Sequence, residues 1–175
     1  MVPRLSALFG RASFALALIL VVATAVQAQS PIRAQVYEFG TYTSEGGVEI
    51  GTTRQGIVRS QTSGVRQLEA TRKVLGKLGV EFGFRYKLVG VRPGALVPLT
   101  IIAKFPPPGV LARDSQKPIV QDDYADVTTA GKEDFLTWTF ETRSDLVPGT
   151  WTFEIWSGKQ KLAEESFEVI LPPTS

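Results

Sequence analysis

Apolar and polar residues alternate along several stretches of the chain. Between residues 151 and 155, Trp151, Phe153 and Ile155 take every second position, and the residues between them are polar. This period of two residues is typical of a β-strand with one buried face. The same pattern recurs in four other stretches, which we predict to be strands: residues 34–42, 80–89, 96–105 and 135–142.

The stretch 148–170 predicts a β-hairpin. A plain two-residue turn at residues 158–159 would put Phe167 on the opposite face from Trp151. A loop of three or five residues, or a bulge near residues 164–165, restores the match, because a one-residue slip moves every side chain to the other face. We therefore expect three opposed pairs: Trp151 with Phe167, Phe153 with Glu165, and Ile155 with Ala163.

The spacing of these stretches predicts the fold class. About seven or eight strands, separated by Pro-Gly or Gly turns and without a convincing helix, favour an all-β, immunoglobulin-like antiparallel β-sandwich. A small β-barrel is the alternative. Residues 44–64 are rich in Gly, Ser and Thr and predict short edge pieces and loops. Residues 65–75 fit both helical and strand periods, and we favour a strand there.

The first 28 residues have the pattern of a cleaved signal peptide. Arg4 and Arg11 precede an apolar run over residues 12–26, and a small-residue motif places the cleavage before Gln29. The run is shorter than the about 20 residues of a membrane-spanning helix, so an anchor is the weaker alternative. We expect residues 29–175 to form a single domain, without a membrane span, that is periplasmic or secreted.

The chain contains neither cysteine nor histidine. This composition excludes a thiol nucleophile, a histidine base in a serine triad, and imidazole or thiolate ligands for a metal. We therefore expect no cofactor and a non-enzymatic role. A hydrolase that uses carboxylates alone is an alternative, and it would need two convergent acids in a cleft.

Charge is distributed unevenly along the chain. From Arg54 to Arg92 there are nine basic and two acidic residues, whereas from Arg113 to Ile170 there are six basic and twelve acidic residues. The basic part could bind an anionic lipid or polymer, while nucleic acid is an improbable partner for an exported protein. We favour mutual neutralisation, in which basic strands lie beside acidic ones.

Two features stand out as candidate contacts with a ligand or partner. The first is the acidic cluster Asp122, Asp123 and Asp126 around Tyr124, where we expect a solvated loop; calcium binding and acid–base chemistry are alternatives. The second is Trp156, which is out of phase with the apolar face of its strand and should lie on the opposite face. Our candidate residues are Asp122, Asp123, Tyr124 and Trp156.

Three motifs carry a resemblance to a known family. They are the strand Val80 to Tyr86 with Phe82-Gly83-Phe84, the run Leu99 to Pro107 ending in IIAKFPP, and the closing PGTWTFEIWSGKQKLAEESFEV. Together they resemble a bacterial family of exported domains of unknown function, the one numbered thirty-eight fifty-nine. The resemblance covers most of the chain after the signal segment. It implies the fold and export, and it supplies no catalytic residues.

These observations favour an accessory module of the bacterial cell envelope. We expect it to act by protein–protein contact, through an edge strand and the face that carries Trp156. The alternative is a domain that binds carbohydrate or a cell-wall polymer, which would show a row of exposed Trp and Tyr on one flat face.

Overall fold

Strands make up nearly all of the regular structure of the chain. The computed structural model describes residues 31–113 and 115–173, so the predicted signal peptide lies outside the described residues. The elements are β1 (Arg33–Thr52), β2 (Val58–Glu69), β3 (Lys73–Leu75), β4 (Glu81–Val89), β5 (Leu96–Lys104), β6 (Val110–Leu111), β7 (Pro118–Ile119), β8 (Gln121–Thr129), β9 (Glu133–Thr139), the 3₁₀ helix η1 (Arg143–Asp145), β10 (Gly149–Ser157) and β11 (Gln160–Ile170). None of the described elements is a helix of the length and apolarity needed to cross a membrane.

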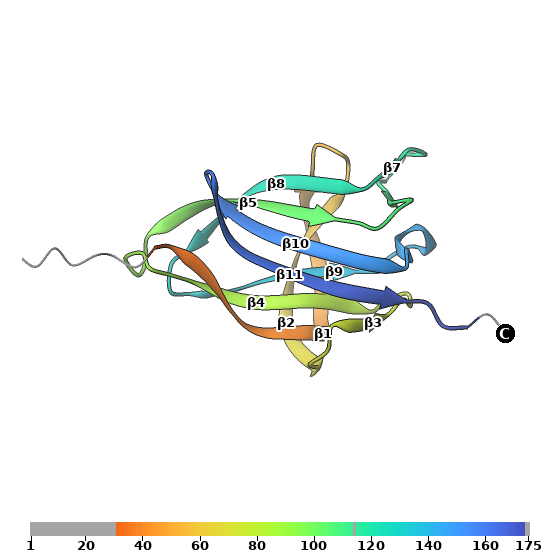
Figure 1. The fold of residues 1–175 in the computed structure, drawn as a ribbon, viewed down its shortest axis with the longest axis horizontal. Helices are drawn as coiled ribbons and strands as arrows, with labels where there is room; N and C mark the ends of the chain where they lie inside the picture. The colour runs from red at the N-terminus through yellow and green to blue at the C-terminus, as the bar shows by residue number, and fades with distance from the viewer. Residues whose placement is uncertain (1–30, 114, 174–175) are drawn as a thin grey trace, which may run out of the picture.

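Two open sheets pack face to face (Figure 1). The four-stranded sheet has the order β2-β1-β4-β9, and the five-stranded sheet has the order β3-β11-β10-β5-β8. The predicted β-sandwich is confirmed, and because neither sheet closes on itself the barrel alternative is wrong for the described chain. The strands outnumber the predicted seven or eight because β3, β6 and β7 are only two or three residues long, too short to leave a period in the sequence.

An aromatic cluster holds the two sheets together. Phe82 of β4 lies 5.1 Å from Phe140, 5.7 Å from Trp151 and 5.4 Å from Phe167, measured between ring centroids. All four side chains are buried, and the indole Nε1 of Trp151 donates a hydrogen bond of 2.8 Å to the Val147 carbonyl. The apolar faces that the alternation predicted therefore meet in one core.

The β10–β11 hairpin has the predicted register. Trp151 pairs with Phe167, Phe153 with Glu165 and Ile155 with Ala163, as expected. The turn, however, has only two residues, Gly158 and Lys159, and the extra residue is Leu162, which interrupts the ladder between Ile155 and Trp156. The expected odd loop is wrong; the alternative, a bulge in the second strand, is present, but at Leu162 instead of at residues 164–165. A bulge at Leu162 shifts the register by one residue and buries the Leu162 side chain.

The first two strands form a long hairpin where we expected short pieces and loops. β1 continues to Thr52 and pairs with β2 through four register irregularities, which bend the ribbon. Residues 44–64, which we call the arm, cross the other strands behind the sandwich and reach the level of β8 (Figure 1). The Gly, Ser and Thr content that suggested loops instead accompanies a bent, solvent-exposed ribbon.

The two lateral openings of the sandwich are closed in different ways. On one side, Arg72 lies 3.6 Å above the ring of Phe39 and forms a 2.7 Å hydrogen bond to Glu165 of β11. Arg72 sits in the break between β2 and β3, so the predicted strand over residues 65–75 is interrupted at residues 70–72. On the other side the arm covers the opening between β8 and β9 and leaves a cleft there.

Candidate functional site

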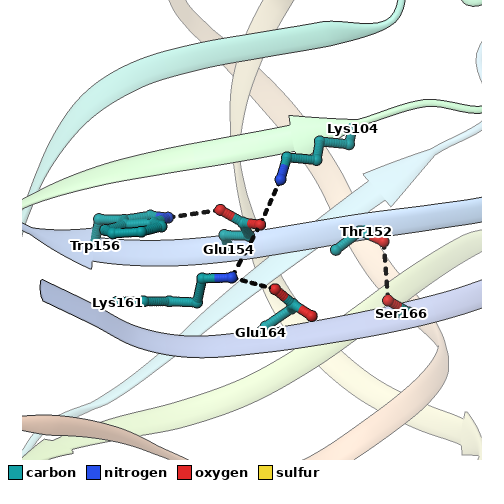
Figure 2. Close-up of polar contacts among 7 residues, drawn as sticks. All are labelled: Lys104, Thr152, Glu154, Trp156, Lys161, Glu164 and Ser166. Carbon is teal, nitrogen blue, oxygen red and sulfur yellow. Dashed lines mark hydrogen bonds and ion pairs between the residues drawn. The ribbon is translucent and has the colours of Figure 1, made fainter.

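Trp156 lies on the outer face of the five-stranded sheet, opposite to the core, as predicted. Its Nε1 donates a 2.7 Å hydrogen bond to Glu154, whose carboxylate also accepts bonds from Lys104 (2.6 Å) and Lys161 (3.2 Å) (Figure 2). Glu154 is only 2 % exposed, because the lysine stems and the indole cover it. The carboxylate therefore fixes the orientation of a partly exposed tryptophan.

The pKa of Glu154 reflects two opposed effects. Burial disfavours the charged carboxylate, but the hydrogen bonds from Lys104, Trp156 and Lys161 outweigh burial and lower the pKa from its ordinary 4.5 to about 2. Because the pKa is lower in the folded than in the unfolded chain, ionised Glu154 stabilises the fold. The contribution is present above pH 4.5 and is lost as the pH falls through about 2.

We expect Glu154→Gln to lower the free energy of unfolding at pH 7 by about 1–3 kcal/mol, a range that allows for screening of the two exposed lysines. The difference from wild type should shrink as the pH falls from 5 to 2. Urea denaturation at several pH values measures it. Glu168→Gln is the control, because Glu168 is exposed and, among the described residues, its carboxylate accepts a single bond, of 3.1 Å, from Thr150. A pH-independent difference for Glu154→Gln would contradict the assignment.

Apolar side chains continue from Trp156 toward β8. Trp156 pairs with Thr100 of β5, which pairs with Ala125, and in the next row Pro98 pairs with Val127. The side chains of Pro98, Ala125 and Val127 are exposed, and Val127 is 58 % accessible. We call Pro98, Ala125, Val127 and Trp156 the Trp156 patch. Beside Trp156, Lys104 and Lys161 bind Glu154, and Lys161 also binds Glu164 (Figure 2).

The acidic cluster is not a solvated loop. It lies within β8, where pairing with the apolar strand β5 turns alternate residues inward. Asp122 pairs with buried Ala103 and Tyr124 with buried Ile101, so both face the other sheet, whereas Asp123 lies on the outer face. The sequence did not predict this half-buried strand, because three of its residues between 122 and 126 are acidic. Carboxylates are rarely buried without a partner, so such a segment is expected to be exposed.

Asp122 and Tyr124 line a cleft of about 450 Å³ between β8, β9 and the arm. Asp122 is 2 % exposed, and its Oδ1 has no hydrogen-bond partner among the described residues. Burial raises the pKa of Asp122, and the nearby Thr53 side chain opposes part of the rise. Burial also raises the pKa of Tyr124, to about 12, although Arg59 acts in the opposite direction.

Two arginines of the hairpin bind the acidic strand. Arg54 pairs with Asp123 at 3.4 Å, and Arg59 pairs with Asp126 at 3.6 Å. Three further basic residues from the region 54–92 also pair with carboxylates: Arg72 with Glu165, Arg85 with Glu38 and Lys87 with Glu133. Four of these five carboxylates belong to the acidic part of the chain, which agrees with the expected mutual neutralisation.

Both free strand edges beside the cleft carry an aspartate that binds the next backbone amide. Asp126 Oδ1 accepts a 2.9 Å bond from the Val127 amide in β8, and Asp134 Oδ1 accepts a 2.9 Å bond from the Phe135 amide in β9. Occupied amides make an edge less able to pair with an added strand. The candidate edge strands are therefore poorer docking sites than the Trp156 patch.

A second cavity of about 630 Å³ shares the arm residues Ile57, Val58, Ser60 and Thr62 with this cleft. Both cavities are lined by Trp138, whose Nε1 is buried and has no hydrogen-bond partner among the described residues. Sequence reasoning missed Arg59 and Trp138 as site residues. Arg59 comes from β2, whereas Trp138, like Asp134, comes from β9, and the two strands meet only through packing of the arm, so no local spacing could indicate the site.

The structure does not bring all four candidate residues together. Asp122 and Tyr124 share the cleft, Asp123 faces away from it, and Trp156 belongs to the separate outer patch. Because Asp123 points away from Asp122 and Asp126, the three aspartates do not converge on one ion. Among the described residues there is no group of three or more acidic, histidine or cysteine side chains suited to a metal.

Comparisons with known proteins give the fold and the family. No curated protein matches the chain. Among solved structures, an immunoglobulin-like protein of Pseudomonas aeruginosa is 27 % identical, with a TM-score of 0.57 over 82 % of this chain and 99 % of that one. The chain therefore has an immunoglobulin-like fold, which is compatible with a non-enzymatic binding module.

The profile of one family matches residues 29–169, nearly all of the described chain. That family is described as a domain of unknown function, and the match confirms the resemblance carried by the Phe82-Gly83-Phe84, IIAKFPP and closing-hairpin motifs. The chain belongs to the DUF3859 family.

Proposed function

We propose that the chain is an exported, non-enzymatic accessory module of the bacterial envelope that binds another protein through the Trp156 patch. The observation that carries the proposal is the fixed indole of Trp156, held by Glu154 and continuous with exposed Pro98, Ala125 and Val127. An aromatic anchor whose orientation is set before binding loses little entropy on contact. The surrounding Lys and Glu side chains provide a polar rim.

The site geometry favours contact through this face over strand addition. The amides of Val127 and Phe135 on the free edges of β8 and β9 are already bound by aspartates. The signal-like segment at residues 1–28 supports an envelope location.

The carbohydrate alternative lacks its distinguishing feature. All Trp and Tyr residues lie in the described part of the chain, and they form no row on one face: Tyr37 is exposed on β1, Trp156 lies on β10, and Trp151 is buried. The hydrolase alternative has a cleft with acids, but Asp126 and Asp134 there already accept bonds from backbone amides. We therefore favour protein binding.

Capture experiments with matched variants test the proposal. Tagged residues 29–175 are used to capture partners from an envelope extract, and the bound proteins are identified. Val127→Asp should abolish capture of the partner, while Val48→Asp, the same change at an exposed valine of the arm, should leave capture intact. Equal capture by both variants, or equal loss, would contradict binding through the Trp156 patch.

A further inference from the structure

Arg59 of the arm contacts both an aromatic ring and a carboxylate. Its guanidinium carbon is 3.9 Å from the centroid of the Tyr124 ring, and its Nη2 is 3.6 Å from Asp126 Oδ2. This is the arrangement in which proteins recognise organic cations, because the ring face and the carboxylate both present negative potential. In the protein without a ligand, the cation at this position is the guanidinium of Arg59 itself.

The cleft around Arg59 has more negative than positive groups. Among the described residues, its charged lining consists of Asp122, Asp126 and Asp134 against Arg59. Asp126 and Asp134 are each bound by a neighbouring amide, while Asp122 Oδ1 is buried without a partner. One guanidinium therefore does not neutralise the three carboxylates, and an anionic ligand would be repelled.

The contact of Arg59 is weak enough to be exchanged. The 3.6 Å ion pair is longer than a charge-assisted hydrogen bond of about 2.7–2.9 Å, and the Arg59 side chain keeps 27 % of its surface accessible. The cleft also leaves about 450 Å³ beside Tyr124, enough for a further side chain or a small ligand.

We propose that the cleft formed by Tyr124, Asp122 and Asp126 is a binding site for a guanidinium or ammonium group, which Arg59 of the arm occupies until a basic ligand displaces it. The ligand is an arginine- or lysine-bearing peptide segment or a small free amine, since both present the same cation. The cleft shares Val127 with the Trp156 patch, but Tyr124, Asp122 and Asp126 lie outside the patch, and the proposal does not depend on the function proposed for the patch.

Binding of two cationic probes to wild type and to two arm variants tests the proposal. The probes are agmatine, a small guanidine, and a capped peptide with two arginines; maltotriose serves as the neutral probe. Arg59→Ala removes the internal competitor and should tighten agmatine binding about 3- to 30-fold, the range expected for a partly exposed cation–π contact plus ion pair. Calorimetry measures the affinity.

Arg54→Ala is the matched control. It removes the same charge from the same hairpin, but Arg54 is 81 % exposed and its partner Asp123 faces away from the cleft. We expect less than a twofold change for it. If both variants bind agmatine more tightly by the same factor, the change in net charge alone explains the effect, and the proposed cation site is wrong. Binding of maltotriose in place of the cations would overturn it as well.

Two further measurements keep the proposal testable if Arg59→Ala loosens the arm. In wild type, saturating agmatine should shift the NMR signals of the Tyr124 ring and leave those of exposed Tyr37 unchanged. Unshifted Tyr124 signals would overturn the proposal. Tighter binding of the peptide than of agmatine identifies a protein segment as the source of the cation, and equal affinity identifies a small free amine.

Discussion

Trp151→Ala should lower the free energy of unfolding by about 3–5 kcal/mol, a large share of the stability of an ordinary domain. Trp151 is fully buried, and its ring contacts Phe105 at 4.9 Å and Phe82 at 5.7 Å in edge-on geometry. The substitution removes these contacts, leaves a cavity between the two sheets, and deprives the Val147 carbonyl of its 2.8 Å hydrogen bond. Urea denaturation monitored by circular dichroism measures the loss.

The same substitution on the opposite face provides the control. Trp156→Ala removes an indole that lies on the outer face and is bound mainly through Glu154. Its cost should be about 1 kcal/mol, since no core contact is lost. Similar losses for the two variants would mean that Trp151 is not the centre of the core. Because both variants replace a tryptophan by alanine, their effects on the free energy of the unfolded chain are similar and largely cancel when the two losses are compared.

The fold was predictable wherever one face of a strand is apolar. The register of Trp151 against Phe167 followed from matching apolar faces, and the structure has that register. The device that produces it, a bulge at Leu162, did not follow, because a bulge and an odd loop shift the register equally. The arm escaped prediction for a related reason. Its residues are mostly polar or glycine, and its few valines and isoleucines are scattered, so they leave no clear period to recognise.

The candidate site was predictable only in part. Trp156 could be placed on the outer face because its neighbours Trp151 and Ile155 define the inner one. The cleft could not be derived, since Arg59 and Tyr124 are 65 residues apart in the sequence and meet through the bend of β1. Asp122 was recognised as a candidate, but its burial follows from pairing with β5, a long-range contact that composition does not reveal.

Gly83→Ala should lower the free energy of unfolding by about 3 kcal/mol or more, although it adds a single methyl group. Gly83 pairs with Thr137 of β9, and a Cβ at this position would overlap the Leu136 carbonyl oxygen and lie 2.7 Å from Thr137 Cα. Both obstacles are backbone atoms, so the conflict can be relieved only by moving β9 away from β4. Urea denaturation measures the loss.

Gly46→Ala is the matched control, because Gly46 also lies in a strand of the four-stranded sheet and a Cβ there meets nothing within 4 Å. It should be neutral or slightly stabilising. A loss below about 0.5 kcal/mol for Gly83→Ala would show that β9 adapts freely. Since β9 also carries Trp138 and Asp134 into the cleft, any displacement that Gly83→Ala causes should weaken agmatine binding too. The glycine of the Phe82-Gly83-Phe84 motif thus lets β4 hold β9, and with it one wall of the cation site, at close range.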